Sequence, residues 1–298
     1  MGAFTMDDDW LVFDPDPSVP QFILPPGSVD SHCHVFGPGD EFPYAPERKY
    51  TPGDAGKDQL FALRDHLGVS RNVIVQATCH GTDNSSMLDA LRSSGGRARG
   101  VATIDPSISH DELTEMHDAG VRAVRFNYLP RLVDPQPDDY YHRIVDKIRP
   151  LGWHVVIYFE AADLAARWDF FTSLDTVVVV DHVGRPDVSR GVDGEEFGLF
   201  LRLVGENPNF WVKVTCPERL THAGAPYDDV VPFARRVVDE FADRVLWGTD
   251  WPHPNLKSHM PDDGALVDFV PRIAPSAGAR QRLLVDNPTR LYWEGESW

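Results

Sequence analysis

Eight short apolar runs rich in β-branched residues recur along the chain, and they constrain its fold more than any other feature. Most of them are continuous apolar stretches, which is typical of parallel strands covered on both faces. Amphipathic, helix-like segments lie between them, among them residues 57–67, 83–94, 110–120 and 228–244. Eight strand–helix repeats predict an α/β fold with one domain, a (β/α)8 TIM-type barrel. The eight runs read GSVDSHCHVF, RNVIVQAT, RARGVATID, VRAVRFNYL, HVVIYFE, TVVVVDHVG, NFWVKVT and RVLWGTD.

A doubly wound parallel sheet is the alternative for a chain of 298 residues with this alternation. That fold would place a glycine-rich phosphate turn of the form G-x-G-x-x-G after its first strand. The residues at the end of the first run, HCHVFGPG, do not contain this pattern. The sequence therefore favours a barrel over residues 27–298, preceded by an acidic, proline-rich N-terminal arm over residues 1–26.

The composition limits the partners of such a barrel. A net charge of −18 disfavours nucleic acids and anionic membranes, and an anionic substrate would need a local cluster of arginines. The chain contains no apolar run of the roughly 18 residues that a membrane span needs, and its acidic N-terminus does not resemble a secretory signal. Three cysteines without paired spacing indicate a reducing setting. We expect a cytoplasmic protein with a small-molecule partner, and the sequence carries no signature of an oligomeric state.

Polar and ionisable residues gather at the carboxyl ends of the predicted strands, where barrel enzymes place their active sites. A barrel with a purely structural role has no need of this concentration. The sequence therefore predicts an active site at this end of the barrel. The residues are His32, His34, Thr78, Asp105, Arg125, Asn127, Tyr158, Glu160, His182, Thr215 and Asp250.

The His-x-His pair of the first strand is the most specific of these signals. Alternate residues of a strand point to one face, so His32 and His34 both enter the barrel mouth. With His182 and Asp250 on later strands, they follow the order His-x-His…His…Asp of a metal-dependent hydrolase. Asp250 could instead cap a helix, but two prolines follow it closely and favour the role of general base.

The residues leave open whether these histidines hold a metal. A two-metal site is disfavoured, because the fourth and fifth strands offer arginine, asparagine and tyrosine in place of the further ligands it needs. A single divalent ion held by His32, His34 and Asp250 would generate hydroxide. Alternatively, imidazoles and arginines polarise a carbonyl while Asp250 activates water without a metal. The second route suits an enol ester with a good leaving group and does not suit an amide.

Three arginines predict an anionic substrate. Arg125 interrupts an apolar strand near its end and is not expected there without an anion to pair with. Arg131 follows in the next loop, and Arg219 lies after the seventh strand. Guanidinium groups bind carboxylates in a bidentate manner, so three of them imply more than one carboxylate. Candidate hydroxyl donors to the same ligand are Tyr50, Thr78 and Tyr158.

Several longer motifs carry a family resemblance, and they span about Gly27 to Trp293. The chain resembles the amidohydrolase superfamily and, within it, the 2-pyrone-4,6-dicarboxylate lactonases. The resemblance implies reversible hydrolysis of that lactone to 4-oxalomesaconate or its enol tautomer, 4-carboxy-2-hydroxymuconate. It also implies catalysis without a divalent metal, in the protocatechuate 4,5-cleavage route of lignin-aromatic degradation. The motifs are HCHVFGP, RNVIVQATCHGTDN, RLVD, GWHVVIYFEA, DHVGRPDV, CPERL, WGTDWPHPN and NPTRLYW.

The resemblance also implies a role for each matching residue. Asp250 would activate water, and His32, His34 and His182 would surround the lactone carbonyl and stabilise its oxyanion. The three arginines would hold the substrate carboxylates, helped by Tyr50, Thr78, Tyr158 and Asn255. No cofactor is expected. The alternatives are a metal-dependent hydrolase of a related carboxylated or sulfonated muconolactone or sugar-acid lactone, and a barrel that binds a dicarboxylate without turning it over.

Overall fold

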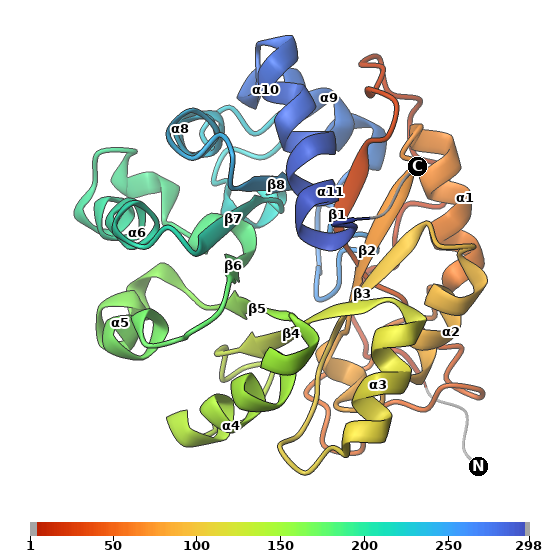
Figure 1. The fold of residues 1–298 in the computed structure, drawn as a ribbon. Coiled ribbons are helices and arrows are strands. Elements are labelled where there is room, and N and C mark those ends of the chain that lie inside the picture. Colours follow the sequence, from red (N-terminus) through yellow and green to blue (C-terminus); the bar gives the residue numbers. More distant parts are fainter. Residues whose placement is uncertain (1–4, 296–298) are drawn as a thin grey trace.

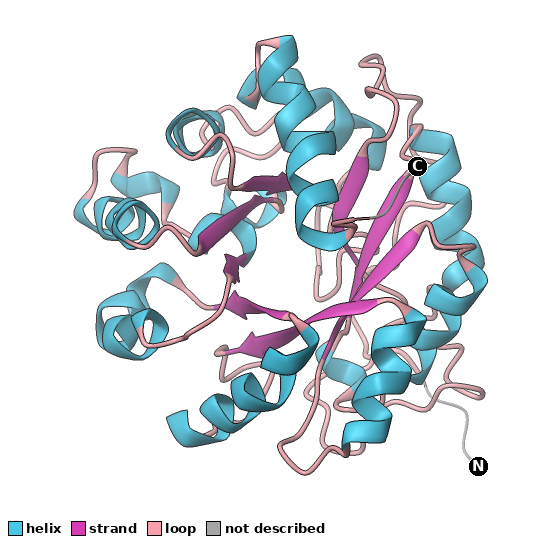
Figure 2. Ribbon diagram, in the orientation of Figure 1, coloured by secondary structure: helices cyan, strands magenta, loops and turns pink. Residues whose placement is uncertain are grey.

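The eight apolar runs form the eight strands of one sheet in the computed structural model, which describes residues 5–295. The strands are parallel and follow one another in chain order, and helices surround them (Figures 1 and 2). The predicted (β/α)8 barrel is thereby confirmed. The strands are β1 (Val29–Cys33), β2 (Arg71–Val75), β3 (Ala98–Ala102), β4 (Val121–Asn127), β5 (His154–Tyr158), β6 (Val178–Val180), β7 (Phe210–Val214) and β8 (Val245–Trp247).

The helices form the outer ring of the barrel, and each of the four predicted amphipathic segments contains one of them. Within residues 5–295, no helix combines the length and the hydropathy needed to cross a membrane. The α-helices are α1 (Lys57–Leu67), α2 (Ser85–Ser93), α3 (His110–Ala119), α4 (Asp138–Ile148), α5 (Leu164–Thr172), α6 (Glu195–Glu206), α7 (Pro217–Leu220), α8 (Val231–Glu240), α9 (Asp263–Ile273), α10 (Ala277–Gln281) and α11 (Asn287–Tyr292). Short 3₁₀ turns are η1 (Thr78–His80), η2 (Arg149–Leu151), η3 (Ala161–Asp163), η4 (Asp181–Gly184) and η5 (Val188–Arg190), and η6 (Arg282–Asp286) is a π turn.

Alternation along the strands separates two apolar cores. One core lies between the strands and the helices and contains most of the buried hydrophobic residues. The other fills the barrel interior, because every second residue of a strand points inward. Tyr292 and Trp293 at the end of the chain belong to the interior core and are 1% exposed. The interior core comprises Val29, Val73, Val75, Val101, Ala123, Val156, Val179, Trp211, Leu246, Tyr292 and Trp293.

The barrel closes between β1 and the segment that follows β8. The Asp250 N–H donates to the His32 carbonyl at 2.7 Å, and the His34 N–H donates to the Trp251 carbonyl at 2.7 Å. The closure therefore lies at the predicted active site and sets the position of Asp250 relative to both histidines. Gly248 makes this approach possible, because a Cβ there would lie 2.5 Å from the His32 nitrogen.

The described part of the N-terminal arm packs beside the barrel mouth. The Leu11 N–H donates to the Leu256 carbonyl at 2.8 Å, and the Thr51 N–H donates to the Asp7 carboxylate at 2.8 Å. The ring of Phe13 lies 4.9 Å from that of Trp251. Residues 1–4 of the predicted arm and residues 296–298 of the predicted barrel lie outside the described residues, so these two outer limits stay predictions.

We predict that Gly248→Ala destabilises the protein by about 1–3 kcal/mol, because the added methyl group meets backbone that cannot move without opening the closure. The free energy of unfolding in urea measures this loss. Gly198→Ala is the matched control: a Cβ at this position in α6 has no neighbour within 4 Å. Since alanine favours a helix over glycine, Gly198→Ala should leave the stability unchanged or raise it by up to about 1 kcal/mol. Equal stability of the two variants would contradict the closure argument.

Candidate active site

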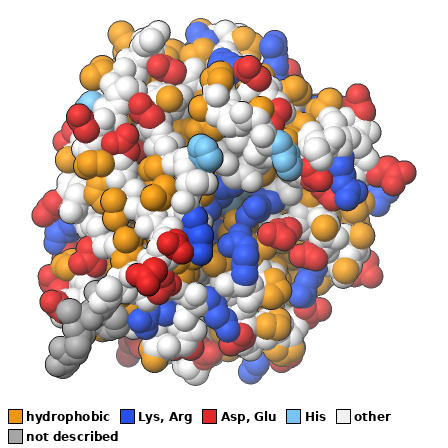
Figure 3. Space-filling model, turned by 180° about the vertical axis from the view of Figure 1, so that it is seen from behind, with side chains coloured by type: hydrophobic (Ala, Val, Ile, Leu, Met, Phe, Trp, Pro, Cys, Tyr) orange, Lys and Arg blue, Asp and Glu red, His pale blue; other side chains and the backbone are white. Residues whose placement is uncertain are grey.

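Most of the predicted site residues converge on one cavity at the barrel mouth, whereas Asp105, Asn127, Glu160 and Thr215 do not line it. His32 does not line this cavity; it is 0% exposed and lies next to the lining histidines. On the corresponding face of the molecule, Lys and Arg side chains gather around a hollow, with Asp and Glu scattered beyond it (Figure 3). The predicted residues that line the cavity are His34, Tyr50, Thr78, Arg125, Arg131, Tyr158, His182, Arg219, Asp250 and Asn255.

Asp250 follows β8 and has a φ of +70°, a conformation that is uncommon outside glycine. Its Oδ2 accepts from Nε and Nη2 of Arg219, at 3.2 and 3.0 Å, and its Oδ1 lies 3.2 Å from Nε2 of His34. Burial alone would raise the pKa of Asp250, but the Arg219 guanidinium and the His34 contact hold that pKa well below its usual range. Asp250 is therefore ionised and oriented by fixed partners.

His34 is held between two acceptors. Its Nδ1 lies 2.8 Å from the Val75 carbonyl, which can only accept, so Nδ1 carries a hydrogen. Nε2 then faces the Asp250 carboxylate. This contact orients His34 beside the carboxylate that is predicted to remove a proton from water.

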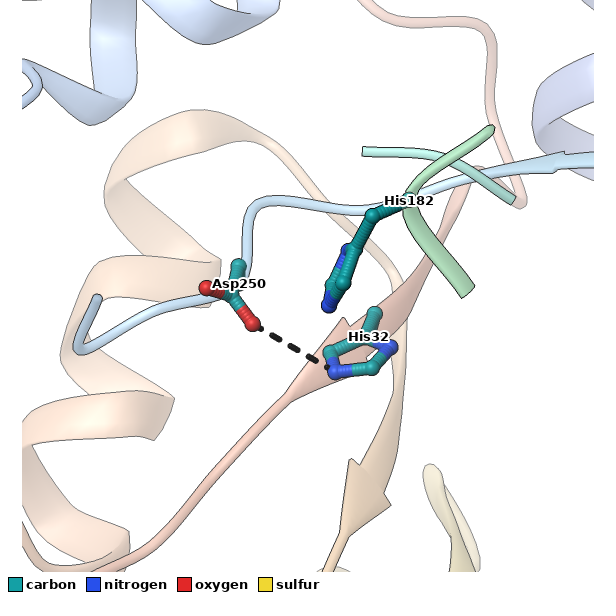
Figure 4. Close-up of side chains that lie close together, drawn as sticks. All are labelled: His32, His182 and Asp250. Atoms are coloured by element: carbon teal, nitrogen blue, oxygen red, sulfur yellow. Dashed lines mark ion pairs between the residues drawn. The ribbon is translucent and has the colours of Figure 1, made fainter. Parts of the chain in front are cut away.

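The other two histidines are buried and neutral. Burial and the nearby Lys213 ammonium lower the pKa of His32 to about 3, and its Nε2 lies 3.4 Å from Asp250 (Figure 4). Burial holds the pKa of His182 well below its usual value, and its Nδ1 lies 2.6 Å from the Thr215 hydroxyl. Neutral imidazoles can each present an N–H to a developing oxyanion without adding charge.

A buried ion cluster lies directly behind His32, and sequence reasoning did not find it. Asp181 and Lys213 are both 0% exposed, with Nζ of Lys213 3.3 Å from Oδ1 of Asp181. Arg125 donates to Oδ2 of Asp181 through Nε at 3.0 Å and pairs with it through Nη2 at 2.9 Å. The available signal was the lysine inside the apolar run NFWVKVT. A lysine is almost never fully buried unless it is paired, so this one required a partner.

The three predicted arginines differ in what they already bind. Arg125 and Arg219 each bind a buried aspartate through Nε and Nη2. Among the described residues, their Nη1 atoms remain available to another ligand. Arg131 is 46% exposed, and its nearest carboxylate is that of Glu160, at 3.9 Å. Arg131 is thus the arginine most available to a ligand. Arg185, which was not predicted, donates to the Tyr158 hydroxyl at 3.0 Å.

The remaining predicted residues supply hydroxyl and amide groups. Tyr50 is buried, which raises the pKa of its phenol well above the usual value and keeps it a neutral donor. Thr78 begins η1 after β2, and Tyr158 ends β5. Asn255 has a φ of +66°, in the same strained segment as Asp250. The structure brings all of these groups to one cavity, while their roles in a reaction stay predictions.

Three of the predicted side chains could reach a common metal ion. Ligand atoms of His32, His182 and Asp250 lie within 4.8 Å of one another (Figure 4). This set differs in one residue from the metal ligands predicted from the sequence: His182 stands in place of His34. Charge opposes binding at this position, because Asp250 is already paired with Arg219 and Lys213 contacts the far side of His32. A divalent ion would add two positive charges beside two buried cations. The distances between the donor atoms therefore suit an ion, but the charges around them do not.

A second buried network supports the segment that carries Asp250. His253 is 0% exposed, and its Nε2 lies 3.1 Å from Asp263. Its Nδ1 lies 3.8 Å from the carboxylate of Glu218, the neighbour of Arg219 in the chain. Burial lowers the pKa of His253, but the charges of Asp263 and Glu218 outweigh burial and raise it to about 10. His253 is thus an imidazolium that joins this segment to α7 and α9.

Comparison with known proteins places this site in a family. Residues 29–293 match the amidohydrolase family, and the chain belongs to it. The resemblance noted in the motifs is confirmed by a relative of the same kind: the chain is 65% identical over 304 aligned residues to the 2-pyrone-4,6-dicarboxylate hydrolase of Comamonas testosteroni, covering 99% of this chain and 100% of the relative.

Two further comparisons extend this result. The 4-sulfomuconolactone hydrolase of Rhizobium radiobacter is 38% identical, with 91% of both chains covered. The crystal structure of a candidate 2-pyrone-4,6-dicarboxylic acid hydrolase from Pseudomonas putida superposes with a TM-score of 0.78 at 33% identity, covering 92% of this chain and 100% of that one. The chain is therefore an enzyme of the hydrolase class, built on the barrel that its sequence predicts.

We predict that His253 stabilises the fold in a pH-dependent way. Its folded pKa of about 10 lies above the ordinary value of 6.5, so its contribution is fully present below pH 6.5 and is lost as the pH rises towards 10. The contribution is of the order of 5 kcal/mol at most. Urea unfolding of His253→Gln should therefore show a large loss of stability at pH 6 and a smaller loss at pH 10. The exposed His110→Gln is the control, and a loss at His253 that does not vary with pH would contradict the imidazolium.

Proposed function

We propose that this protein hydrolyses the ring ester of 2-pyrone-4,6-dicarboxylate, opening the lactone to 4-oxalomesaconate or its enol tautomer, 4-carboxy-2-hydroxymuconate. The observation that carries the proposal is the cavity itself, in which three guanidinium groups surround an ionised aspartate and two histidines. In a chain of net charge −18, such a cluster suits a small dianion. The 65% identity to a hydrolase of this lactone supports the same substrate. The reversible reaction would serve protocatechuate 4,5-cleavage in the degradation of lignin aromatics, in the cytoplasm.

We propose further that the reaction proceeds without a bound metal. The mouth already holds four cations, on Arg125, Arg131, Arg219 and Lys213, against the three carboxylates of Asp181, Asp250 and Glu218, the last 3.6 Å from Arg219. A dianionic substrate compensates this excess of positive charge, and a divalent ion would increase it. The polarising power that a metal supplies elsewhere would come here from fixed N–H donors, which need no reorganisation during the reaction.

The chemistry follows from the placement of Asp250. A water molecule adds to the lactone carbonyl carbon, and its proton passes to the Asp250 carboxylate, next to His34. The carbonyl oxygen becomes an oxyanion beside the N–H groups of the neighbouring histidines. When the tetrahedral intermediate collapses, the bond from the carbonyl carbon to the ring oxygen breaks. The ring oxygen leaves as an enolate that takes up the proton held by Asp250, which restores the carboxylate. The good leaving group allows a carboxylate with a lowered pKa to serve as the base.

A second substrate is favoured by one specific observation. The relative from Rhizobium radiobacter, at 38% identity, hydrolyses 4-sulfomuconolactone. A sulfonate would also bind to guanidinium groups, so the arginines alone do not separate the two lactones. A comparison of kcat/KM for both lactones decides between them. A preference for the sulfonated lactone, together with loss of activity in a chelator, would favour a metal-dependent hydrolase of that substrate.

We predict that the purified protein consumes 2-pyrone-4,6-dicarboxylate, measured as loss of the pyrone absorbance, at a rate that a metal chelator does not change. Asp250→Asn should lower kcat by about 10²–10⁴-fold, because it removes the base. Asp134→Asn, an exposed change in the loop after β4, is the matched control. Loss of activity in the chelator would reject the metal-free route, and an active Asp250→Asn protein would reject Asp250 as the base.

We predict that Arg131→Met raises KM about 10–100-fold with a smaller change in kcat, because a substrate carboxylate loses a charged partner. Arg131 is a cleaner test of the clamp than Arg125, whose removal would leave Asp181 buried with one partner fewer. The exposed Arg143→Met in α4 is the control. An unchanged KM would mean that Arg131 does not bind the substrate.

A further inference from the structure

Lys213 lies inside the barrel, although its strand is otherwise apolar. In β7, Trp211 belongs to the interior core, and Lys213, two residues further on, points to the same face. Its side chain is 0% exposed. Placing a lysine in this position is costly, and burial accordingly lowers its pKa while Asp181 opposes the shift. A lysine kept there against this cost requires a specific explanation.

The Lys213 nitrogen contacts two groups. It lies 3.1 Å from Nδ1 of His32 and 3.3 Å from Oδ1 of Asp181. Oδ1 of Asp181 is also 3.2 Å from Nδ1 of His32. Two groups of opposite character therefore compete for one imidazole nitrogen: Lys213 can only donate to it, and the Asp181 carboxylate can only accept from it.

The outcome of this competition decides which nitrogen of His32 carries the hydrogen. If Asp181 accepts from Nδ1–H, then Nε2 of the neutral ring presents a lone pair to Asp250. If Lys213 donates to Nδ1, then Nε2 carries the hydrogen. The geometry favours Lys213, because its contact with Nδ1 meets hydrogen-bond criteria, whereas Oδ1 of Asp181 has no hydrogen-bond partner among the described residues. Arg125 and Lys213 already compensate the charge of Asp181.

We infer that Lys213 is a positioning residue that sets the tautomer of His32, so that Nε2 carries the hydrogen. Nε2 lies 3.4 Å from Asp250 and has no hydrogen-bond partner among the described residues, so its hydrogen remains available to the reacting carbonyl. The catalytic part of this inference rests on the proposed lactone hydrolysis, and the tautomer itself does not. With Lys213 in place, His32 directs an N–H rather than a lone pair towards the oxyanion from behind the cavity lining. Without it, Asp181 draws the hydrogen to Nδ1, and the lone pair on Nε2 repels the oxyanion.

The first test measures the tautomer directly. Two-dimensional ¹H–¹⁵N spectra of the wild-type protein labelled at histidine distinguish a bare ring nitrogen from one that carries a hydrogen, and the signals of His32 are those lost in His32→Gln. We expect a bare Nδ1 and a protonated Nε2 in the wild type, without substrate. A hydrogen on Nδ1, or on both nitrogens, overturns the inference. In Lys213→Met the hydrogen should move to Nδ1, and an unchanged pattern in that variant also overturns it.

The second test measures the consequence for the reaction. Lys213→Met should lower kcat for the pyrone by about 10²–10³-fold, the cost of losing one oxyanion donor, and should change KM less than threefold, since the arginines are intact. Lys147→Met is the matched control, because Lys147 is a partly buried lysine of α4 that donates to the Ile108 carbonyl outside the barrel. An unchanged kcat in Lys213→Met with a shifted tautomer rejects the catalytic role.

The two tests separate the inference from the proposed function. A wild-type protein that does not consume the pyrone rejects the proposed substrate, while the spectrum of His32 still decides the tautomer. If Lys213→Met fails to fold, the wild-type spectrum alone decides: a bare Nδ1 supports Lys213 as the donor, and a hydrogen on Nδ1 rejects it.

Discussion

The barrel mouth depends on the pairing of its buried charges. Asp250 follows β8 and pairs with Arg219 of α7, while Asp181 follows β6 and pairs with Arg125 of β4 and with Lys213 of β7. Each pairing joins the ends of different strands, so the charges fix the mouth as a unit. Removal of one partner from a buried pair costs about 3–5 kcal/mol, because the other charge is left without compensation. The same contacts therefore hold the reacting groups in position and stabilise this end of the barrel.

The backbone around these charges is strained, and the closure of the barrel supports the strain. His182, Cys216 and Asp250 have φ values of +52°, +57° and +70°. Each of these conformations costs of the order of 1 kcal/mol or more for a residue with a side chain, and they cluster where function requires them. Here they lie two or three residues after the ends of β6, β7 and β8, where the chain leaves the strand, and the side chains of His182 and Asp250 line the cavity. The backbone hydrogen bonds between β1 and the segment after β8 hold Asp250 in this conformation.

The fold could be predicted from the sequence because a run of apolar residues reflects local burial. Eight such runs, separated by helical segments, are compatible with few architectures. The sequence also placed His32, His34 and Asp250 at one mouth, since barrel topology brings all strand ends together. It could not assign Lys213, because a parallel strand is covered on both faces and its pattern does not tell inside from outside. Its partner Asp181 is the neighbour of His182 in the motif DHVGRPDV, and the motif does not show that Asp181 pairs with a lysine. A pairing between residues 32 positions apart depends on strand register, which periodicity does not contain.

The charge balance of the mouth also determines which kind of donor the reaction can use. The mouth holds one positive charge in excess: the cations are Arg125, Arg131, Arg219 and Lys213, and the carboxylates are Asp181, Asp250 and Glu218. A substrate with two carboxylates reverses this to an excess of one negative charge. As water adds and Asp250 takes up its proton, the negative charge of Asp250 moves to the oxyanion. The oxyanion is tolerable there only if hydrogens are directed at it from groups whose orientation is already set. Neutral imidazoles meet this requirement only in one of their two tautomers. A buried lysine that selects the tautomer therefore acts on the reaction without touching the substrate.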